Sequence, residues 1–256
     1  MEKGAAQDHR TPSAGSPNHS EVPAGVEVSA LIETPSLAGE PGLPAPGAFL
    51  RGVQVVKAYR YGAAMVVVSC GSVVDFEGDA IVNAANAGCL GGGGVDGAVS
   101  SAGGPDMRRE REALPILKGT RMNRCATGDA KMTTGGSLKA RKCIHAVGPN
   151  YLMYRGRGKS LEDADELLAS AYQRAVAVAR DSGVVRSIAF ALLSAGVFRG
   201  PRKLEEVLLI GVRALAGELA KSSGAAVLNE VHLMAFTGAE EDALLAVCDR
   251  IFTIFD

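Results

Sequence analysis

The sequence lacks the features that mark several large classes of protein. No apolar run in its 256 residues reaches the ~18–20 residues that a membrane-spanning helix needs, so we expect no membrane partner. The N-terminal segment lacks the basic and apolar parts of a secretory signal. With 27 basic and 28 acidic residues, the formal net charge is −1, which disfavours nucleic acid as a partner.

Cysteine and histidine are too few and too scattered for a disulfide framework or a metal site. The five cysteines, an odd number, include no Cys-x-x-Cys pair, which is typical of reduced thiols in an intracellular protein. Only His145 and His232 lie outside the low-complexity N-terminal segment, and no metal-ligand cluster forms around them. We therefore predict an intracellular protein, cytoplasmic or nuclear with a mitochondrial location left open, that needs no metal and no cofactor.

Residues 1–48 differ in composition from the rest. They contain seven of the eleven prolines and no aromatic residue, and their two basic and six acidic residues give a net charge of −4. Such a segment buries too little apolar surface to offset its ordering entropy. We predict a flexible tail over residues 1–48, followed by one domain over residues 49–256. Within the tail, Val26–Ile32 is apolar enough to pack on the domain as a short helix or arm.

From Phe49 onward, β-branched runs alternate with amphipathic segments. The runs predict strands at residues 53–59, 65–70, 80–82, 142–147, 187–192 and 230–236, the first two forming a hairpin. A helix is expected to start at the capping-box-like Ser160 and to end near Gly183. The helical period predicts further helices at residues 203–221 and 240–255, and shorter ones at Val95 and at 106–113. This alternation indicates an α/β fold, a three-layer α/β/α domain with a central mixed sheet.

The segment Asp79–Gly97 carries the densest chemical signal. A buried strand ends in two amide side chains, Asn83 and Asn86, and four glycines follow, Gly91–Gly94, before a helix starts at Val95. Four glycines are poor core material because each loses much backbone entropy on folding. They do let the backbone bend closely around a ligand. Backbone N–H groups of such a loop, with a helix N-terminus behind them, favour an anion such as pyrophosphate.

Two familiar phosphate motifs fit this segment poorly. The glycine run and Gly97 satisfy Gly-x-Gly-x-x-Gly, but eight residues separate Val82 from the run, and no strand ending in an acid follows about twenty residues later. A P-loop requires Gly-Lys-Ser/Thr, whereas Gly94 is followed by Val-Asp. A purely structural turn is a third interpretation. Against it, Asn86 and Asp96 flank the loop and offer the donor and the acceptors that sugar hydroxyls need.

The segment resembles the signature of macrodomains, and its Gly-Gly-Gly-Gly-Val-Asp-Gly form resembles the MacroD-type branch. Three further matches follow in the family's order. Cys125–Ala130 is similar to a Thr-Gly-x-Ala segment, Cys143–Pro149 to a family strand and turn, and Leu193–Phe198 to an Ile-Ser-Thr-Gly-Val-Phe loop. The likeness covers nearly the whole folded region. It implies a monomer whose partners are ADP-ribose and ADP-ribosylated proteins.

The resemblance also implies roles for the matching residues. The phosphate next to the distal ribose would lie on Gly91, Gly92, Gly93, Gly94 and Val95. The pyrophosphate would be held from the other side by backbone N–H groups of Ser194, Ala195, Gly196, Val197 and Phe198, and Phe198 would pack against the distal ribose. The implied catalytic residues are Asn86, which would meet ribose hydroxyls, and Asp96, which would orient or deprotonate an attacking water.

The implied activity is hydrolysis. The enzyme would remove mono-ADP-ribose from ester-linked Asp or Glu side chains of modified proteins and would also deacetylate O-acetyl-ADP-ribose. The alternative is a reader module that binds ADP-ribose without turnover. Asp96 favours the enzyme, because a pure reader needs no carboxylate at the anomeric end. Recognition of another nucleotide or an RNA end is a third possibility, which the missing basic patch disfavours.

Three positions depart from the family pattern. Ser72 stands where the family usually has an Asp that accepts from the adenine amino group, so adenine selectivity is expected to be weaker or to rest on a neighbouring backbone N–H such as that of Val73. Ser100 stands where a histidine often helps to hold the loop Asp, so the tuning of Asp96 is expected to differ. Arg199, Gly200 and Pro201 stand where the family tends to have Gly-aromatic-Pro, and Arg199 is predicted to reach the pyrophosphate or the target protein.

Several other conspicuous residues have plain structural interpretations. Asn83 is expected to tie loops together, and His145 to be a core histidine with satisfied ring nitrogens. Cys89 and Cys143 are predicted to be small buried residues, since no cationic neighbour is evident that would lower a thiol pKa. The run of Arg108, Arg109 and Arg111 is predicted to be a solvated helix face.

Overall fold

The computed structural model describes residues 42–156, 160–221 and 228–252. The chain divides into two units, Met1–Pro41 and Gly42–Asp256, and the described residues all belong to the second. Most of the predicted tail, Val26–Ile32 included, lies outside the described residues, so the tail and the domain boundary stay predictions. At the start of the described chain, the Gly47 N–H donates to the Val55 carbonyl over 2.8 Å.

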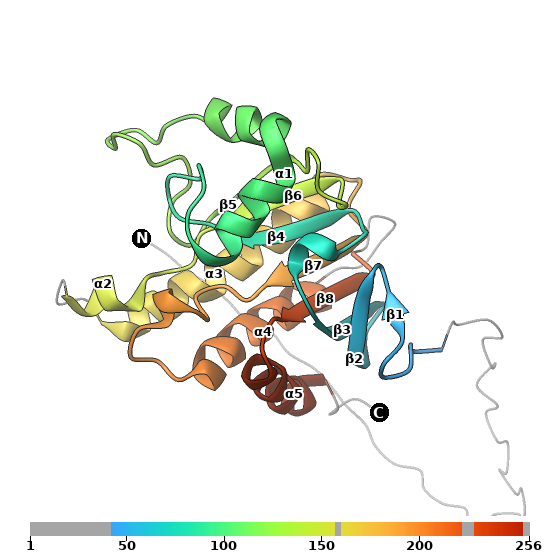
Figure 1. Ribbon diagram of the computed structural model, residues 1–256. Coiled ribbons are helices and arrows are strands. Elements are labelled where there is room, and N and C mark those ends of the chain that lie inside the picture. Colours follow the sequence, from blue (N-terminus) through green and yellow to red (C-terminus); the bar gives the residue numbers. More distant parts are fainter. Residues whose placement is uncertain (1–41, 157–159, 222–227, 253–256) are drawn as a thin grey trace, which may run out of the picture. The chain divides into compact units, whose positions relative to one another are not determined.

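An eight-stranded mixed sheet forms the centre of this unit (Figure 1). Its order is β1-β2-β3-β8-β7-β4-β6-β5. The strands are β1 (Phe49–Leu50), β2 (Val53–Tyr61), β3 (Ala64–Cys70), β4 (Ala80–Ala84), β5 (Ala130–Thr134), β6 (Lys142–Ala146), β7 (Ser187–Ala191) and β8 (Glu230–Ala235). The run β3-β8-β7-β4-β6 is parallel, and antiparallel strands flank it on both sides.

Helices cover both faces of the sheet. They are α1 (Gly94–Ala113), α2 (Tyr151–Gly156), α3 (Leu161–Asp181), α4 (Leu204–Ala220) and α5 (Gly238–Phe252). The alternation along β4 shows why there are two cores: Ala80 and Val82 join the cluster under α3, α4 and α5, whereas Ile81 joins the cluster under α1. The predicted three-layer α/β/α fold is thereby confirmed.

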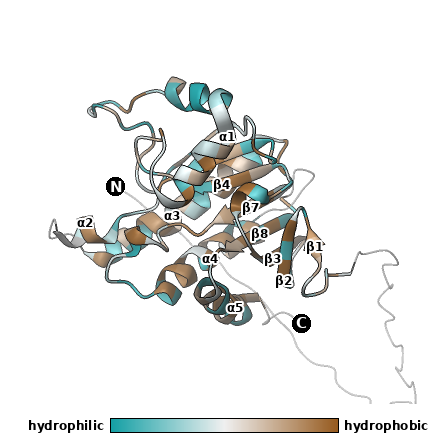
Figure 2. Ribbon diagram, viewed as in Figure 1, coloured by the Kyte–Doolittle hydropathy of each residue, from teal (hydrophilic) through white to brown (hydrophobic). Residues whose placement is uncertain are grey.

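The predicted elements lie within a few residues of the observed ones. As expected, Ser160 caps α3 by accepting from the Asp163 N–H over 3.0 Å, and Gly183 follows the helix with φ +69°. Three elements, β1, β5 and α2, were not predicted. The two short helices predicted at Val95 and at 106–113 correspond to the two parts of α1, which is kinked at Gly104. Figure 2 shows that the last part of α1 is largely hydrophilic.

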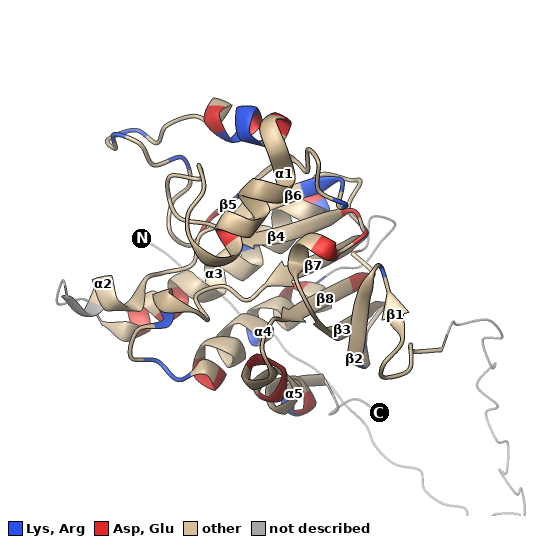
Figure 3. Cartoon of the chain, in the orientation of Figure 1, with Lys and Arg blue, Asp and Glu red and all other residues tan. Residues whose placement is uncertain are grey.

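Most of the charged residues lie on the helices and loops, and only a few lie in the strands (Figure 3). Within the described residues, no helix is long and apolar enough to cross a membrane. Over the same ranges, no group of three or more His, Cys, Asp or Glu residues is placed to hold a metal ion.

One polar chain does enter the sheet, at the start of β8. Glu230 accepts from Arg51 over 2.9 Å and lies 3.0 Å from Nε2 of His232, whose Nδ1 lies 2.8 Å from the Ser69 hydroxyl. Burial alone would raise the pKa of the Glu230 carboxyl, but the hydrogen bonds from His232 and Arg51 outweigh it and lower the pKa to about 2. The chain therefore ties β8 to the β1–β2 turn through a carboxylate that must stay ionised.

This predicts an acid-sensitive contribution to stability. Because the folded-state pKa is depressed from 4.5 to about 2, the contribution is present above pH 4.5 and is lost as the pH falls toward 2. Glu230→Gln should lower the free energy of unfolding by about 2–3 kcal/mol at neutral pH. In urea titrations, the gap from the wild type should narrow as the pH falls below about 4.5 and should close near pH 2. A gap independent of pH would contradict the assignment.

Candidate functional site

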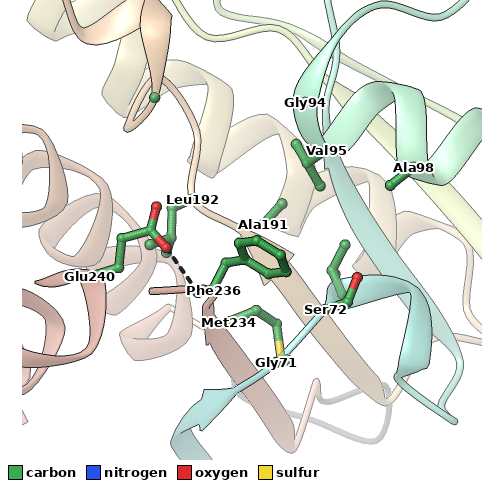
Figure 4. Close-up of a pocket in the computed structure, with 12 residues that line it drawn as sticks. Gly71, Ser72, Gly94, Val95, Ala98, Ala191, Leu192, Met234, Phe236 and Glu240 are labelled. Carbon is green, nitrogen blue, oxygen red and sulfur yellow. Dashed lines mark hydrogen bonds between the residues drawn. The ribbon is translucent and has the colours of Figure 1, made fainter. Parts of the chain in front are cut away.

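A cavity of about 410 Å³ lies at the carboxyl edge of the parallel strands. It is where β3, β7 and β8 end and where α1 begins, a place where ligands bind in open parallel sheets. In Figure 4 the Phe236 ring lies in the middle of the site, with Glu240 and Leu192 to one side and Val95 and Ala98 across from it. The lining residues are Gly71, Ser72, Val73, Gly94, Val95, Ala98, Ala191, Leu192, Gly196, Met234, Phe236 and Glu240.

Five of the predicted ligand-binding residues line this cavity: Ser72, Val73, Gly94, Val95 and Gly196. The others lie beside it, in the glycine loop and in the loop after β7. Phe236 and Glu240, and the residues that end β7 and β8, were not among the predicted site residues. A signal for these existed, because the carboxyl ends of predicted parallel strands meet at one edge of the sheet.

The glycine loop has a conformation that requires glycine at two positions. Gly91 has φ +114° and Gly94 has φ +59°, and the α1 cap at Gly93 is extended. Asn86 braces the loop: its Oδ1 accepts from the Gly88 N–H over 3.0 Å, and its Nδ2 donates to the Gly91 carbonyl over 2.8 Å. The amide that was predicted to meet ribose therefore also fixes the loop.

Asp96 lies in the first turn of α1 and is 3% exposed. Its Oδ1 accepts two hydrogen bonds of 2.8 Å, from Nδ2 of Asn83 and from Nη2 of Arg111. Its Oδ2 is buried and has no hydrogen-bond partner. A Cβ added to Gly92 would lie 3.1 Å from this Oδ2 and 3.0 Å from Nδ2 of Asn86. One carboxylate oxygen is thus held, and the other faces the glycine loop.

A buried chain behind Asp96 explains how Asn83 is oriented. Nδ2 of Asn83 also lies 3.2 Å from Nδ1 of His145. The other ring nitrogen of His145, Nε2, lies 3.0 Å from the Thr133 hydroxyl. Because an amide N–H can only donate, Nδ1 accepts and the imidazole proton sits on Nε2. Burial, with a contribution from Arg111, lowers the pKa of His145 to about 3, so the ring is neutral. The predictions for Asn83 and His145 as structural residues agree with this placement.

The prediction for Arg111 was wrong. Arg108 and Arg109 do form a solvated face, but Arg111 is 1% exposed and bonds to Asp96. It also donates from Nη1 to the Ser100 hydroxyl over 2.8 Å, and this hydroxyl donates to the Asp96 carbonyl over 2.6 Å. Asp96 is therefore held in place although Ser100 replaces the family's histidine, because the guanidinium of Arg111 bonds to its carboxylate.

Arg111 also changes the interpretation of Cys89. The thiol is buried as predicted, but a cation lies near it after all. A hydrogen bond with the Cys125 thiol lowers the pKa of Cys89, burial opposes this, and Arg111 adds to the lowering. Cys143 is a small buried residue as predicted, since burial raises the pKa of its thiol.

The loop after β7 forms the other wall and is partly strained. Ser194 has φ +56°, and its hydroxyl donates to the Pro149 carbonyl over 2.8 Å rather than pointing to the cavity. Arg199 turns back on its own loop, donating to the carbonyls of Ala195 (3.2 Å) and Arg202 (3.1 Å). Val197 is 85% exposed, and Phe198 does not line the cavity.

Comparisons with known proteins agree on one family. The Macro domain model matches residues 82–208. A Macro domain-containing protein of Caldanaerobacter subterraneus subsp. tengcongensis is 40% identical over 167 residues, which cover 65% of this chain and 86% of that protein. A Macro domain-containing protein of Cupriavidus necator is 41% identical over 144 residues, 56% of this chain and 77% of that protein.

Two solved structures are similar as well. The Oceanobacillus iheyensis macrodomain with ADP has a TM-score of 0.67 and 25% identity, covering 77% of this chain and 96% of that one. The Trypanosoma brucei macrodomain in complex with ADP-ribose has a TM-score of 0.58 and 32% identity, covering 70% of this chain and 67% of that one.

Proposed function

The chain belongs to the Macro domain family, and on that premise we propose that it is a MacroD-type enzyme that binds ADP-ribose and hydrolyses its esters. Its substrates are proteins that carry one ADP-ribose unit on an Asp or Glu side chain, and O-acetyl-ADP-ribose. Water adds to the ester, and free ADP-ribose and the carboxylic acid leave as products.

The observation that carries the proposal is the unpaired Oδ2 of Asp96. A buried carboxylate oxygen without a partner is unusual, because each buried acceptor left unsatisfied costs about 1–3 kcal/mol. In the proposal, this oxygen receives the water that attacks the ester and takes its proton. Asp96 also lies at the N-terminus of α1, where the helix dipole favours a negative charge.

Binding of the rest of the ligand is assigned to the neighbouring groups. The phosphates lie between the glycine loop and the backbone of Ser194–Phe198, whose N–H groups are the donors that an anion requires. The adenine occupies the cavity, whose apolar lining with Phe236 suits a flat aromatic base. Ser72 and the carboxylate of Glu240 are polar groups available to it in this cavity.

The proposed function is tested by measuring the release of radiolabelled ADP-ribose from a modified protein. A transferase that has modified itself with radiolabelled mono-ADP-ribose through Asp and Glu is incubated with the full chain, and label loss is measured. We expect release of labelled ADP-ribose. Tight ADP-ribose binding with unchanged label would instead support a reader module. The low exposure of Asp96 (3%) would then be explained by a structural role for its carboxylate.

A second prediction concerns adenine recognition. Ser72→Asp supplies a charged acceptor, and charged hydrogen bonds are worth about 1 kcal/mol more than neutral ones. The substitution should therefore increase the preference for ADP-ribose over its inosine analogue by about fivefold, measured as a ratio of Kd values by calorimetry. Ser72→Ala should not increase it. An unchanged ratio in Ser72→Asp would mean that the base does not contact this residue.

A further inference from the structure

Arg111 is a buried cation that connects three segments around the glycine loop. Besides Asp96 and Ser100 on α1, it bonds through Nε to the carbonyl of Cys89, two residues before the loop. Its side chain is 2% exposed, and that of Asp96 is 4% exposed. A cation without water around it must find such partners, so its position is fixed by all three together.

The approach of Arg111 to Asp96 depends on a kink in α1. On a straight helix, their separation of fifteen positions would span roughly 22 Å, beyond the reach of the two side chains. Gly104 breaks the helix with φ +67° and ψ −163°, and Pro105 starts the second part. A Cβ on Gly104 would meet Ser137 Oγ at 2.9 Å. The kink therefore turns the second part so that its last turn faces the first.

The hydrogen bonds of Arg111 select which carboxylate oxygen of Asp96 is free. Arg111 and Asn83 both donate to Oδ1, and Oδ2 is left toward Gly92. Without the guanidinium, the carboxylate would keep only one of these donors and could turn about its side-chain bonds. Arg111 thus fixes an orientation that the backbone of α1 alone does not.

We propose that Arg111 is the positioning residue of this site, which holds the Asp96 carboxylate and, through Cys89, the start of the glycine loop for ester hydrolysis. This rests on the proposed function. Arg111 touches no substrate; it acts through Asp96, and its loss should be felt in turnover rather than in ADP-ribose affinity.

A double-mutant cycle on the full chain tests this, with Arg111→Lys, Asp96→Asn and the pair. Lysine keeps the charge, but its single nitrogen cannot reproduce the contacts that Nε, Nη1 and Nη2 of Arg111 make with three residues. Using O-acetyl-ADP-ribose, we expect Arg111→Lys alone to lower kcat at least about tenfold, with Kd for ADP-ribose changed less than about threefold. In the Asp96→Asn background the same substitution should lower kcat less than about twofold further. Ser100→Ala, a milder variant, should show the same suppression.

Two results would overturn the inference: equal losses of kcat in both backgrounds, or a loss of affinity as large as that of kcat. Arg108→Lys, an exposed change on the same helix, is the matched control and should leave both constants unchanged. Thermal unfolding without ligand completes the cycle. Arg111→Lys should lower Tm more in the wild type than in Asp96→Asn, and equal lowering would refute the pairing. A wild type without turnover would sink the proposed function alone, because this last measurement needs no substrate.

Discussion

Replacing Asp96 with asparagine is expected to lower kcat for ester hydrolysis about a hundredfold or more, with less than about a threefold change in Kd for ADP-ribose. The amide can still accept from Asn83 and Arg111 through Oδ1. It replaces the free Oδ2, however, with a donor that cannot accept a proton from water. Asparagine is preferred to alanine, because removing one partner of a buried ion pair costs about 3–5 kcal/mol.

Single-turnover rates and calorimetric affinities on the same preparations measure this effect. Asp106→Asn is the matched control, since Asp106 is exposed on the same helix and its carboxylate pairs with Arg109. It should leave both constants as they are. If Asp96→Asn lost affinity and turnover equally, Asp96 would be a binding residue, and the reader module would become the better interpretation.

Replacing Gly92 with alanine is expected to lower kcat about thirtyfold without unfolding the protein. The added Cβ would lie 3.1 Å from Oδ2 of Asp96 and 3.0 Å from Nδ2 of Asn86, in the space that the attacking water needs. No backbone strain accompanies the change, since Gly92 is not among the glycines with positive φ. The loss should therefore appear in turnover and only slightly in Tm.

The control is Gly217→Ala, inside α4, where an added Cβ meets no atom within 4 Å. It should keep full turnover and gain a little stability, because alanine favours a helix. Turnover retained in Gly92→Ala would mean that the reacting water does not lie between the glycine loop and Asp96, and the mechanism would have to place it elsewhere.

Much of the fold was predictable because its signals are local. The parallel strands β4, β6, β7 and β8 are mostly apolar, as is typical of strands covered on both faces. The missed β5 reads Ala-Lys-Met-Thr-Thr and lies at the sheet edge, where one side is open and polar residues are tolerated. The missed β1 has two residues. It pairs with β2, to which the turn at Arg51 connects it.

The candidate site divides in the same way. The glycine loop was predictable, since four glycines in a row before a helix have few other uses. Phe236 and Glu240 follow the end of β8 and reach the cavity only because β8 lies between β3 and β7, a strand order that no single segment encodes. Local sequence predicts where the strands are, but the pairing of distant segments decides which strand ends lie side by side at the cavity.

The sequence by itself determined the α/β class, the glycine loop and the presence of an acid beside it, because these follow from backbone preferences acting over a few residues. The tertiary structure alone decided how that acid is held. Arg111 looked like one of three surface charges, and the kink at Gly104 turned it inward to Asp96. A buried cation must find its partners wherever the packed chain brings them, and here the partner was fifteen residues away.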